Sequence, residues 1–145
     1  MIALDTNVLV AAHRQDSEFH APARAALTGL AESRGRWAIP WPCVHEFLSV
    51  VTHPRIFNPP SSTSEAVAQQ NAWLESPTLA LLAEDGSYWS TLSELVQAAR
   101  IAGPRIHDAR IAALCLRHGV DELWTADRDF GRFPALRVRN PLVGM

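Results

Sequence analysis

The chain of 145 residues has the usual length of one domain, and 48% of its residues are hydrophobic while 19% are charged. This composition is typical of a compact globular protein and excludes an intrinsically disordered chain. No apolar run approaches the length of a membrane span, and the first residues lack the basic and apolar regions of a signal peptide. We therefore expect a single domain over residues 1–145, located in the cytoplasm and without a membrane partner.

The net charge of −2 is distributed unevenly along the chain, and all thirteen basic residues are arginine. Residues 1–99 hold five arginines against ten acids, whereas residues 100–145 hold eight arginines against five acids. Arginine binds phosphate through a planar, bidentate guanidinium group that lysine lacks. The last third of the chain would therefore suit a nucleic-acid backbone, although a coding bias towards arginine explains the same composition equally well.

The first part of the chain alternates short apolar strands with helices. The expected elements, in chain order, are a strand at Met1–Leu4, a helix starting in "NVLVAA" (residues 7–12), a helix at His20–Ser33, a strand at Trp37–Ile39 and a helix at Pro42–His53. In the last helix, Val44, Phe47, Leu48 and Val51 recur at the spacing of one helix face.

The second part continues the alternation after a loop at residues 58–64, "NPPSSTS". Ser62 and Glu65 have the spacing of a capping box, which predicts a helix from there to Leu74. The remaining expected elements are a strand at Thr78–Leu82, a helix at Ser87–Ile101, a helix at His107–His118 capped by Gly119, and strands at Glu122–Thr125 and Leu136–Arg139. This alternation predicts an α/β fold, a three-layer α/β/α sandwich with a mostly parallel central sheet.

Four acidic residues fall where such a fold gathers side chains. Asp5 ends the first strand and Asp127 follows the strand at Glu122–Thr125, and the carboxyl ends of parallel strands meet at one edge of a sheet. Asp108 shares a helix face with the apolar residues of its own helix, and Glu46 lies in a first helical turn beside another apolar face. Each acid alone could serve as a cap or turn residue, but together they predict one acidic crevice.

Clustered carboxylates need a counter-charge, because two unit charges ~5 Å apart repel by about 3 kcal/mol at an effective dielectric constant of ~20. Oxygen ligands favour Mg²⁺ or Mn²⁺ over Zn²⁺. Cys43 and Cys115 have no CxxC spacing, so we expect reduced thiols in the core. His45 and His107 each precede an acid by one residue, and adjacent helical positions do not face each other, which favours surface residues or contacts to a bound substrate over metal ligands.

Four segments match a known pattern in order: "LDTNVLV" (residues 4–10), "HEFL" (45–48), "IHDARIAAL" (106–114) and "LWTADRDF" (123–130). They resemble the four acidic motifs of the PIN-domain nucleases, in particular the VapC-type toxins of bacterial toxin–antitoxin pairs. The resemblance extends from residue 2 to about residue 142. It implies a PIN-like fold and an endoribonuclease (a hydrolase) that depends on Mg²⁺ or Mn²⁺.

The resemblance also implies roles for individual residues. Asp5, Asp108 and Asp127 would be metal ligands, and Glu46 would be a ligand or would orient the attacking water. Thr6, Asn7 and Thr125 match positions that support the acids. Asp129 could share the site or pair with a neighbouring arginine. The arginines close to the motifs could hold the RNA backbone, and these are Arg14, Arg105, Arg110, Arg128 and Arg132.

As a toxin, such a protein would inhibit translation by cutting a structured RNA, with transfer RNA favoured over a ribosomal RNA loop. Its expected partners are this RNA, a cognate antitoxin and a second copy in a homodimer. The apolar stretches at residues 8–12, 44–51 and 66–74, which include Phe47 and Trp73, would be either a surface for the antitoxin or part of the core. The alternative is a PIN-like domain that binds RNA or acts as a scaffold without catalysis. An aspartyl-phosphate phosphatase is disfavoured, because Asn7 stands where that class needs a second aspartate.

Overall fold

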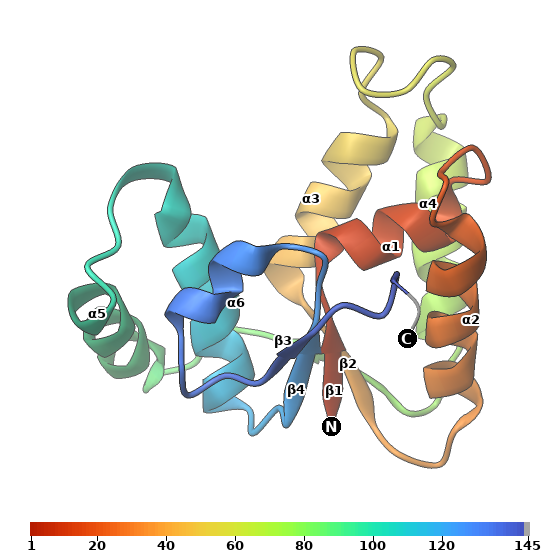
Figure 1. Cartoon of the computed structure of the whole chain (residues 1–145). Helices are drawn as coiled ribbons and strands as arrows, with labels where there is room; N and C mark the ends of the chain where they lie inside the picture. Colours follow the sequence, from red (N-terminus) through yellow and green to blue (C-terminus); the bar gives the residue numbers. More distant parts are fainter. Residues whose placement is uncertain (144–145) are drawn as a thin grey trace.

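The computed structural model describes residues 1–143 and contains a five-stranded parallel sheet flanked by helices (Figure 1). The strands are β1 (Ile2–Leu4), β2 (Trp37–Pro40), β3 (Leu79–Leu82), β4 (Glu122–Trp124) and β5 (Val138–Arg139). The helices are α1 (Thr6–His13), α2 (His20–Glu32), α3 (Trp41–Val51), α4 (Thr63–Leu74), α5 (Tyr88–Ala98) and α6 (Ile106–Arg117), with short 3₁₀ helices η1 (Gly103–Arg105) and η2 (Arg128–Arg132). The predicted α/β class and parallel sheet are confirmed.

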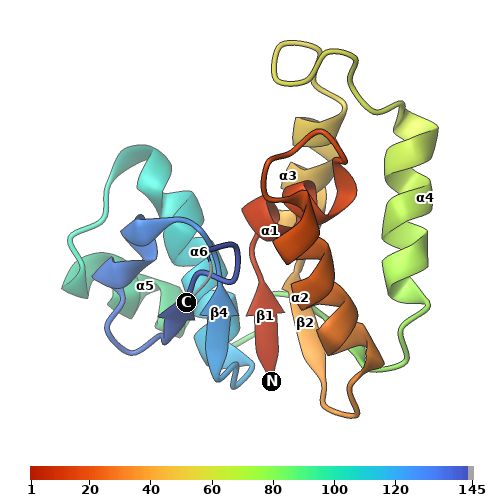
Figure 2. The same ribbon diagram turned by 45° about the vertical axis from the view of Figure 1, so that its right-hand side comes forward.

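The strand order β3-β2-β1-β4-β5 reverses direction at β1. Right-handed crossovers then require the helices between β3 and β4 to cover the face opposite to that covered by the earlier helices. Figures 1 and 2 show this arrangement, with α5 and α6 on one side of the sheet and α2 and α4 on the other. Ligands of such folds bind at the carboxyl ends of the strands beside the reversal, which here are β1 and β4.

The central strands are buried on both faces, as their apolar sequences require. Ala3, Leu4, Ile39 and Leu123 are fully buried, and they pack with helix residues such as Leu114. The indole Nε1 of Trp37 is also buried, and it donates a hydrogen bond to the Ser76 hydroxyl at 3.0 Å. None of the helices among the described residues is long and apolar enough to cross a membrane.

Most of the helix ends with a recognisable capping residue lie where they were predicted, and the end of α5 does not. The capping box at Ser62 and Glu65 is present, and Gly119 ends α6 with a left-handed φ of +70°. Helix α5 instead ends at Ala98, three residues earlier than predicted, because Arg100 adopts a φ of +53° and the Ile101 amide bonds back to the carbonyl of Val96. This is the usual glycine-type ending, made here with an arginine, so the sequence did not reveal it.

Candidate active site

Asp5 lies at the carboxyl end of β1, on one of the two strands where the order reverses. It is the N-cap of α1, with an extended backbone, and its Oδ1 accepts a hydrogen bond from the Thr6 amide at 2.7 Å. Aspartate is among the preferred residues for this cap, and its negative charge complements the helix dipole. The residue is only 5% exposed. The cap therefore holds a carboxylate in a fixed orientation at the reversal point.

Thr125 connects Asp5 to the end of β4. Strand pairing places Leu4 opposite Trp124, and the Asp5 amide donates to the Trp124 carbonyl at 3.0 Å, so residue 5 lies beside residue 125. The Thr125 hydroxyl donates to Asp5 Oδ2 at 2.7 Å and accepts from Asn7 Nδ2 and from the Asp127 amide, both at 3.0 Å. Two sequence segments, 5–7 and 125–127, are thereby joined by one buried hydroxyl.

Asn7 completes the connection between the two segments. Its Nδ2 lies 3.3 Å from Asp5 Oδ2, and its Oδ1 accepts from the Ala126 amide at 3.0 Å. The predicted supporting role of Asn7 and Thr125 therefore has a geometric basis in shared hydrogen bonds. Thr6 differs, because its Oγ1 is buried and has no hydrogen-bond partner among the described residues.

Three further acids converge at the same edge of the sheet. Asp108 from α6, Asp127 and Asp129 each offer a carboxylate oxygen, and these oxygens all lie within 4.8 Å of one another. The segment from Asp127 to Asp129, at the start of η2, is held in one conformation because the Asp129 amide donates to Asp127 Oδ1 at 2.8 Å. Asp129, whose place was ambiguous in the sequence, thus lies beside Asp108 and Asp127, and Arg105 approaches it to 3.9 Å.

A cavity of about 550 Å³ is lined by Asp108 and Asp127 of this group together with Asp5 and Glu46, and Asp129 lies beside it. Glu46 lies on α3, and although part of its side chain is exposed, it lines this cavity with Asp5, Asp108 and Asp127. We call the carboxylates of Asp5, Glu46, Asp108, Asp127 and Asp129 the acidic site.

Burial and mutual repulsion disfavour the charged forms of these acids. Burial raises the pKa of Asp5, and the charge of Asp127 raises it further, while the Thr125 hydrogen bond opposes the shift. The pKa values of Glu46 and Asp108 are also raised, first by burial and then by neighbouring carboxylates. A divalent cation would relieve this repulsion.

The donor set fits Mg²⁺ or Mn²⁺. Every candidate ligand is a carboxylate, three of the oxygens are close enough to share one ion, and these hard metals prefer oxygen ligands. Among the described residues, the cysteines do not form such a cluster. Asp5, Asp108 and Asp127 remain the predicted ligands, and the position of Asp129 adds it to the candidates.

The family model for the PIN domain matches residues 2–136 of this chain. The chain belongs to the PIN-domain family. Ribonuclease VapC43 of Mycobacterium tuberculosis is 36% identical over 144 residues, covering 99% of this chain and 97% of the relative. Ribonuclease VapC31 of the same species is 34% identical over 143 residues, covering 98% and 100%. The resemblance to VapC-type proteins stated from the motifs is confirmed.

Solved structures show the same fold in this PIN domain's neighbours. VapBC2 from Rickettsia felis, bound to a DNA fragment from its promoter, matches with a TM-score of 0.67 at 22% identity, covering 97% of this chain and 98% of that chain. VapC20 of Mycobacterium tuberculosis, described as a sarcin–ricin loop cleaving toxin, also matches at 0.67 with 16% identity, covering 90% and 93%. At these identities the likeness is evidence for the fold alone.

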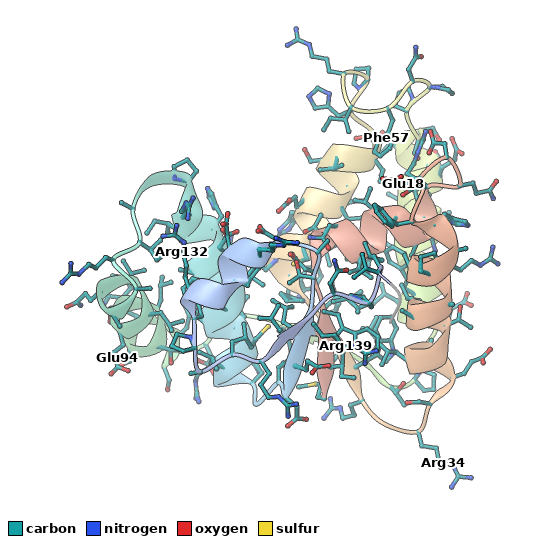
Figure 3. The ribbon with its side chains drawn as sticks, viewed as in Figure 1. Glu18, Arg34, Phe57, Glu94, Arg132 and Arg139 are labelled. Carbon is teal, nitrogen blue, oxygen red and sulfur yellow. The ribbon has the colours of Figure 1, made fainter. Side chains whose placement is uncertain are left out.

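The arginines near the motifs of this PIN domain lie in three different environments. Arg14 and Arg110 are engaged by protein groups, since Arg14 pairs with Asp16 and Arg110 pairs with Glu84 at 2.7 Å. Arg105 lies beside the acidic site. Within residues 1–143, Arg128 and Arg132 form no ion pair, and Figure 3 shows Arg132 projecting from η2 beside α6. Contact with RNA stays a prediction for all five arginines.

Phe47 and Trp73, which the sequence left open between an antitoxin surface and the core, are core residues. Phe47 is fully buried and Trp73 is 7% exposed, and their rings pack together with centroids 4.9 Å apart. The physical reason is that α4 packs on α3, so the sheet is not the only surface that buries these residues. The exposed apolar residues of α4 are instead Val67 and Leu74.

Cys43 contributes to the site but was not predicted to do so. The same holds for Ile56 and Phe57 of the connection between α3 and α4, which line the cavity. The Cys43 thiol is buried and lies 3.5 Å from Asp5 Oδ1, as a weak donor to that oxygen. Burial raises its pKa well above the usual value, so it remains a thiol. Its position one helical turn before Glu46 was the available signal, because residues three apart share a helix face.

Proposed function

We propose that this PIN domain is a Mg²⁺- or Mn²⁺-dependent endoribonuclease of the VapC type. The observation that carries the proposal is the convergence of Asp108, Asp127 and Asp129 oxygens within 4.8 Å, beside a cavity that Asp108 and Asp127 line together with Asp5 and Glu46. The relatives named as VapC ribonucleases, at up to 36% identity over nearly the whole chain, support the same activity.

In this proposal, Asp5, Asp108 and Asp127 hold the cation, with Asp129 close enough to contribute. A divalent cation bound there would lower the pKa of a bound water and neutralise charge on the scissile phosphate. Thr125 and the Thr6 amide keep the Asp5 carboxylate in one orientation, which reduces the reorganisation needed when substrate binds.

Glu46 is the candidate for orienting the attacking water and accepting its proton. It approaches the cavity from α3, whereas Asp108 approaches from α6. Its raised pKa makes its carboxylate a better proton acceptor near neutral pH than an ordinary glutamate. Because water attacks the phosphodiester rather than the ribose 2′-hydroxyl, the products would carry 5′-phosphate and 3′-hydroxyl ends.

The test is to incubate the purified chain with total cellular RNA and to map new 5′ ends. Cleavage should require Mg²⁺ or Mn²⁺, stop in excess EDTA, and fall at least 100-fold in Asp108→Asn, as is typical when a group that stabilises the transition state is lost. Arg34→Gln is the matched control, since Arg34 lies at the far end of the molecule from the acidic site (Figure 3). Full activity of Asp108→Asn would refute the site, and RNA binding without cleavage would support the scaffold alternative.

The biological role that we propose is that of a cytoplasmic toxin that forms a homodimer, cuts structured RNA and is inhibited by a cognate antitoxin. Transfer RNA is the favoured target, and a ribosomal RNA loop is the alternative. The relatives named as VapC ribonucleases support the toxin role, and an antitoxin partner is part of what the VapC resemblance implies. An arginine of the antitoxin would suit the acidic site, because it would neutralise the carboxylates and block the phosphate. Co-purification with the product of a small adjacent gene, with suppressed cleavage, tests this role.

A further inference from the structure

The cavity that contains the acidic site has a second, apolar region. Phe19, from the connection between α1 and α2, and Ile56 and Phe57, from the connection between α3 and α4, line the same cavity as Asp5 and Asp108. We call Phe19, Val50, Ile56 and Phe57 the apolar slot. Phe19 is 37% exposed and Ile56 is 53% exposed, so the slot is open to solvent. A phosphate requires no such surface, and the slot therefore indicates a second recognised group.

Phe57 is held in place by Arg14. The Arg14 guanidinium lies 4.3 Å from the centre of the Phe57 ring, and the same side chain donates to the Pro59 carbonyl at 3.0 Å and to the Ser61 hydroxyl at 3.3 Å. The Phe57 amide also donates to the His53 carbonyl at 3.1 Å. These contacts make Arg14 a positioning residue for the loop, and its predicted contact with RNA stays untested. Because the Phe57 ring is already held in one position, it loses less conformational entropy when a ligand binds.

Helix α1 links the two regions. Asp5 caps its first turn and Arg14 caps its last, so the metal ligand and the residue that holds Phe57 are separated by one helix of eight residues. Such a helix is about 12 Å long at 1.5 Å per residue. Stacked bases rise about 3.4 Å each, so this distance corresponds to a few nucleotides. A group in the slot would belong to the RNA close to the cut bond.

We propose that the apolar slot binds an unpaired RNA base next to the scissile phosphate, with Phe57 as the stacking surface and as a specificity-determining residue. This inference rests on the proposed ribonuclease activity. Sequence-specific proteins read RNA mainly through unpaired bases that stack on aromatic rings and hydrogen-bond at their edges. The cavity supplies aromatic rings for stacking and also polar side chains that could bond to a base edge, because Asn140 and Ser17 line the same cavity as the aromatic residues.

An RNA base fits the slot better than a protein segment does because the slot is continuous with the acidic site. A phosphodiester held by the carboxylates through a cation must carry its neighbouring nucleosides into the remainder of the same 550 Å³ cavity. Binding of the antitoxin to Phe57 in place of RNA is the competing outcome of the test.

The experiment uses a pool of hairpin RNAs with a randomised loop, cleaved by the full chain in Mg²⁺ and sequenced at the new ends. The wild-type protein should prefer certain bases at one position near the cut. Phe57→Leu, which keeps apolar volume but removes the aromatic face, should lower cleavage efficiency about tenfold, the effect of losing one base–aromatic stack, and should reduce this preference because the base edge is then no longer held against the polar residues of the cavity. Phe57→Tyr should retain it. Leu74→Ala is the control, since Leu74 is an exposed apolar residue of α4 that does not line the cavity.

Binding measurements separate the outcomes. Labelled RNA of the preferred sequence, made with a linkage at the scissile position that cannot be hydrolysed, and a copy that is also abasic at the preferred position, are titrated in Mg²⁺ with each protein. The abasic copy should bind the wild type about tenfold more weakly than the intact RNA, and Phe57→Leu should bind both copies alike. If Phe57→Leu cleaves RNA with unchanged base preference, the proposal that the slot binds a base is refuted and the proposed nuclease activity is retained. The same conclusion follows if Phe57→Leu loses only the binding of the antitoxin. Base-dependent binding without cleavage would support the slot and overturn the nuclease.

Discussion

Replacing Thr125 by valine should destabilise the metal-free protein more than its small change in shape suggests. Both lone pairs of the Thr125 hydroxyl accept hydrogen bonds, from Asn7 Nδ2 and from the Asp127 amide, so its proton is directed at Asp5 Oδ2, 2.7 Å away. The residue is 2% exposed, and in Thr125→Val a methyl group takes the place of the hydroxyl. The Asp127 amide then loses its acceptor, and Asp5 Oδ2 keeps only the longer contact of 3.3 Å with Asn7 Nδ2.

The expected loss follows from these three bonds. A hydrogen bond to a charged group contributes about 1.5–3 kcal/mol and a neutral one about 1 kcal/mol, although Asn7 retains a second acceptor in Asp5. Thr125→Val should thus lower the free energy of unfolding by about 3 kcal/mol. Thr125→Ser keeps the hydroxyl and removes one methyl group, at a cost of about 1 kcal/mol.

Urea denaturation of both variants in EDTA measures the difference, because a domain of this size usually unfolds in one step and the midpoint shift reports stability. The Thr125 hydrogen bond also lowers the pKa of Asp5, so its loss should weaken Mg²⁺ binding most at acidic pH. Equal stability of the valine and serine variants, within about 0.5 kcal/mol, would show that the hydroxyl does not organise the site.

Three other measurements test the acidic site and the core. Because the pKa values of Asp5, Glu46 and Asp108 are raised above 3.8 and 4.5, the folded state binds more protons than the unfolded state, and metal-free stability should fall as the pH rises above about 4.5. Saturating Mg²⁺ should abolish that fall in a series of thermal melts. Asp108→Asn should raise the melting temperature without metal at pH 7 and remove the stabilisation by Mg²⁺; a lower melting temperature would argue against repulsion. Gln70→Leu should stabilise the chain by about 1 kcal/mol in urea, since both amide atoms of buried Gln70 are unpaired within residues 1–143.

The fold class and the convergence of the main acids could be predicted because both follow from local sequence patterns. Asp5 directly follows a buried strand, and Asp108 lies on an apolar helix face, so each position restricts the direction of its side chain. The motif order then identified the family. The role of Thr125 as the shared partner of Asp5 and Asp127 could be expected from the resemblance but not from its neighbours in sequence.

Features that depend on long-range packing could not be predicted. Phe47 and Trp73 looked like a possible docking surface, and only the contact between α3 and α4 shows that they are core. The pairing of Arg14 with Asp16 and its position over Phe57 could not be read from the sequence, which shows charge but not the groups that engage it. The early end of α5 depends on an arginine in a conformation that glycine normally adopts.

If the chain is the ribonuclease proposed above, the pairing of β1 with β4 determines when during synthesis it becomes active. Residues 2–4 pair with residues 122–124, so β1, which can pair with β2 early, gains its second neighbour only after more than a hundred further residues have been made. A nascent chain that has not reached Thr125 lacks this threonine and Asp127, so in the proposed role it could not cut the translation machinery that is making it. Fragments left by premature termination should be equally harmless, which expression of residues 1–120 in growing cells would reveal.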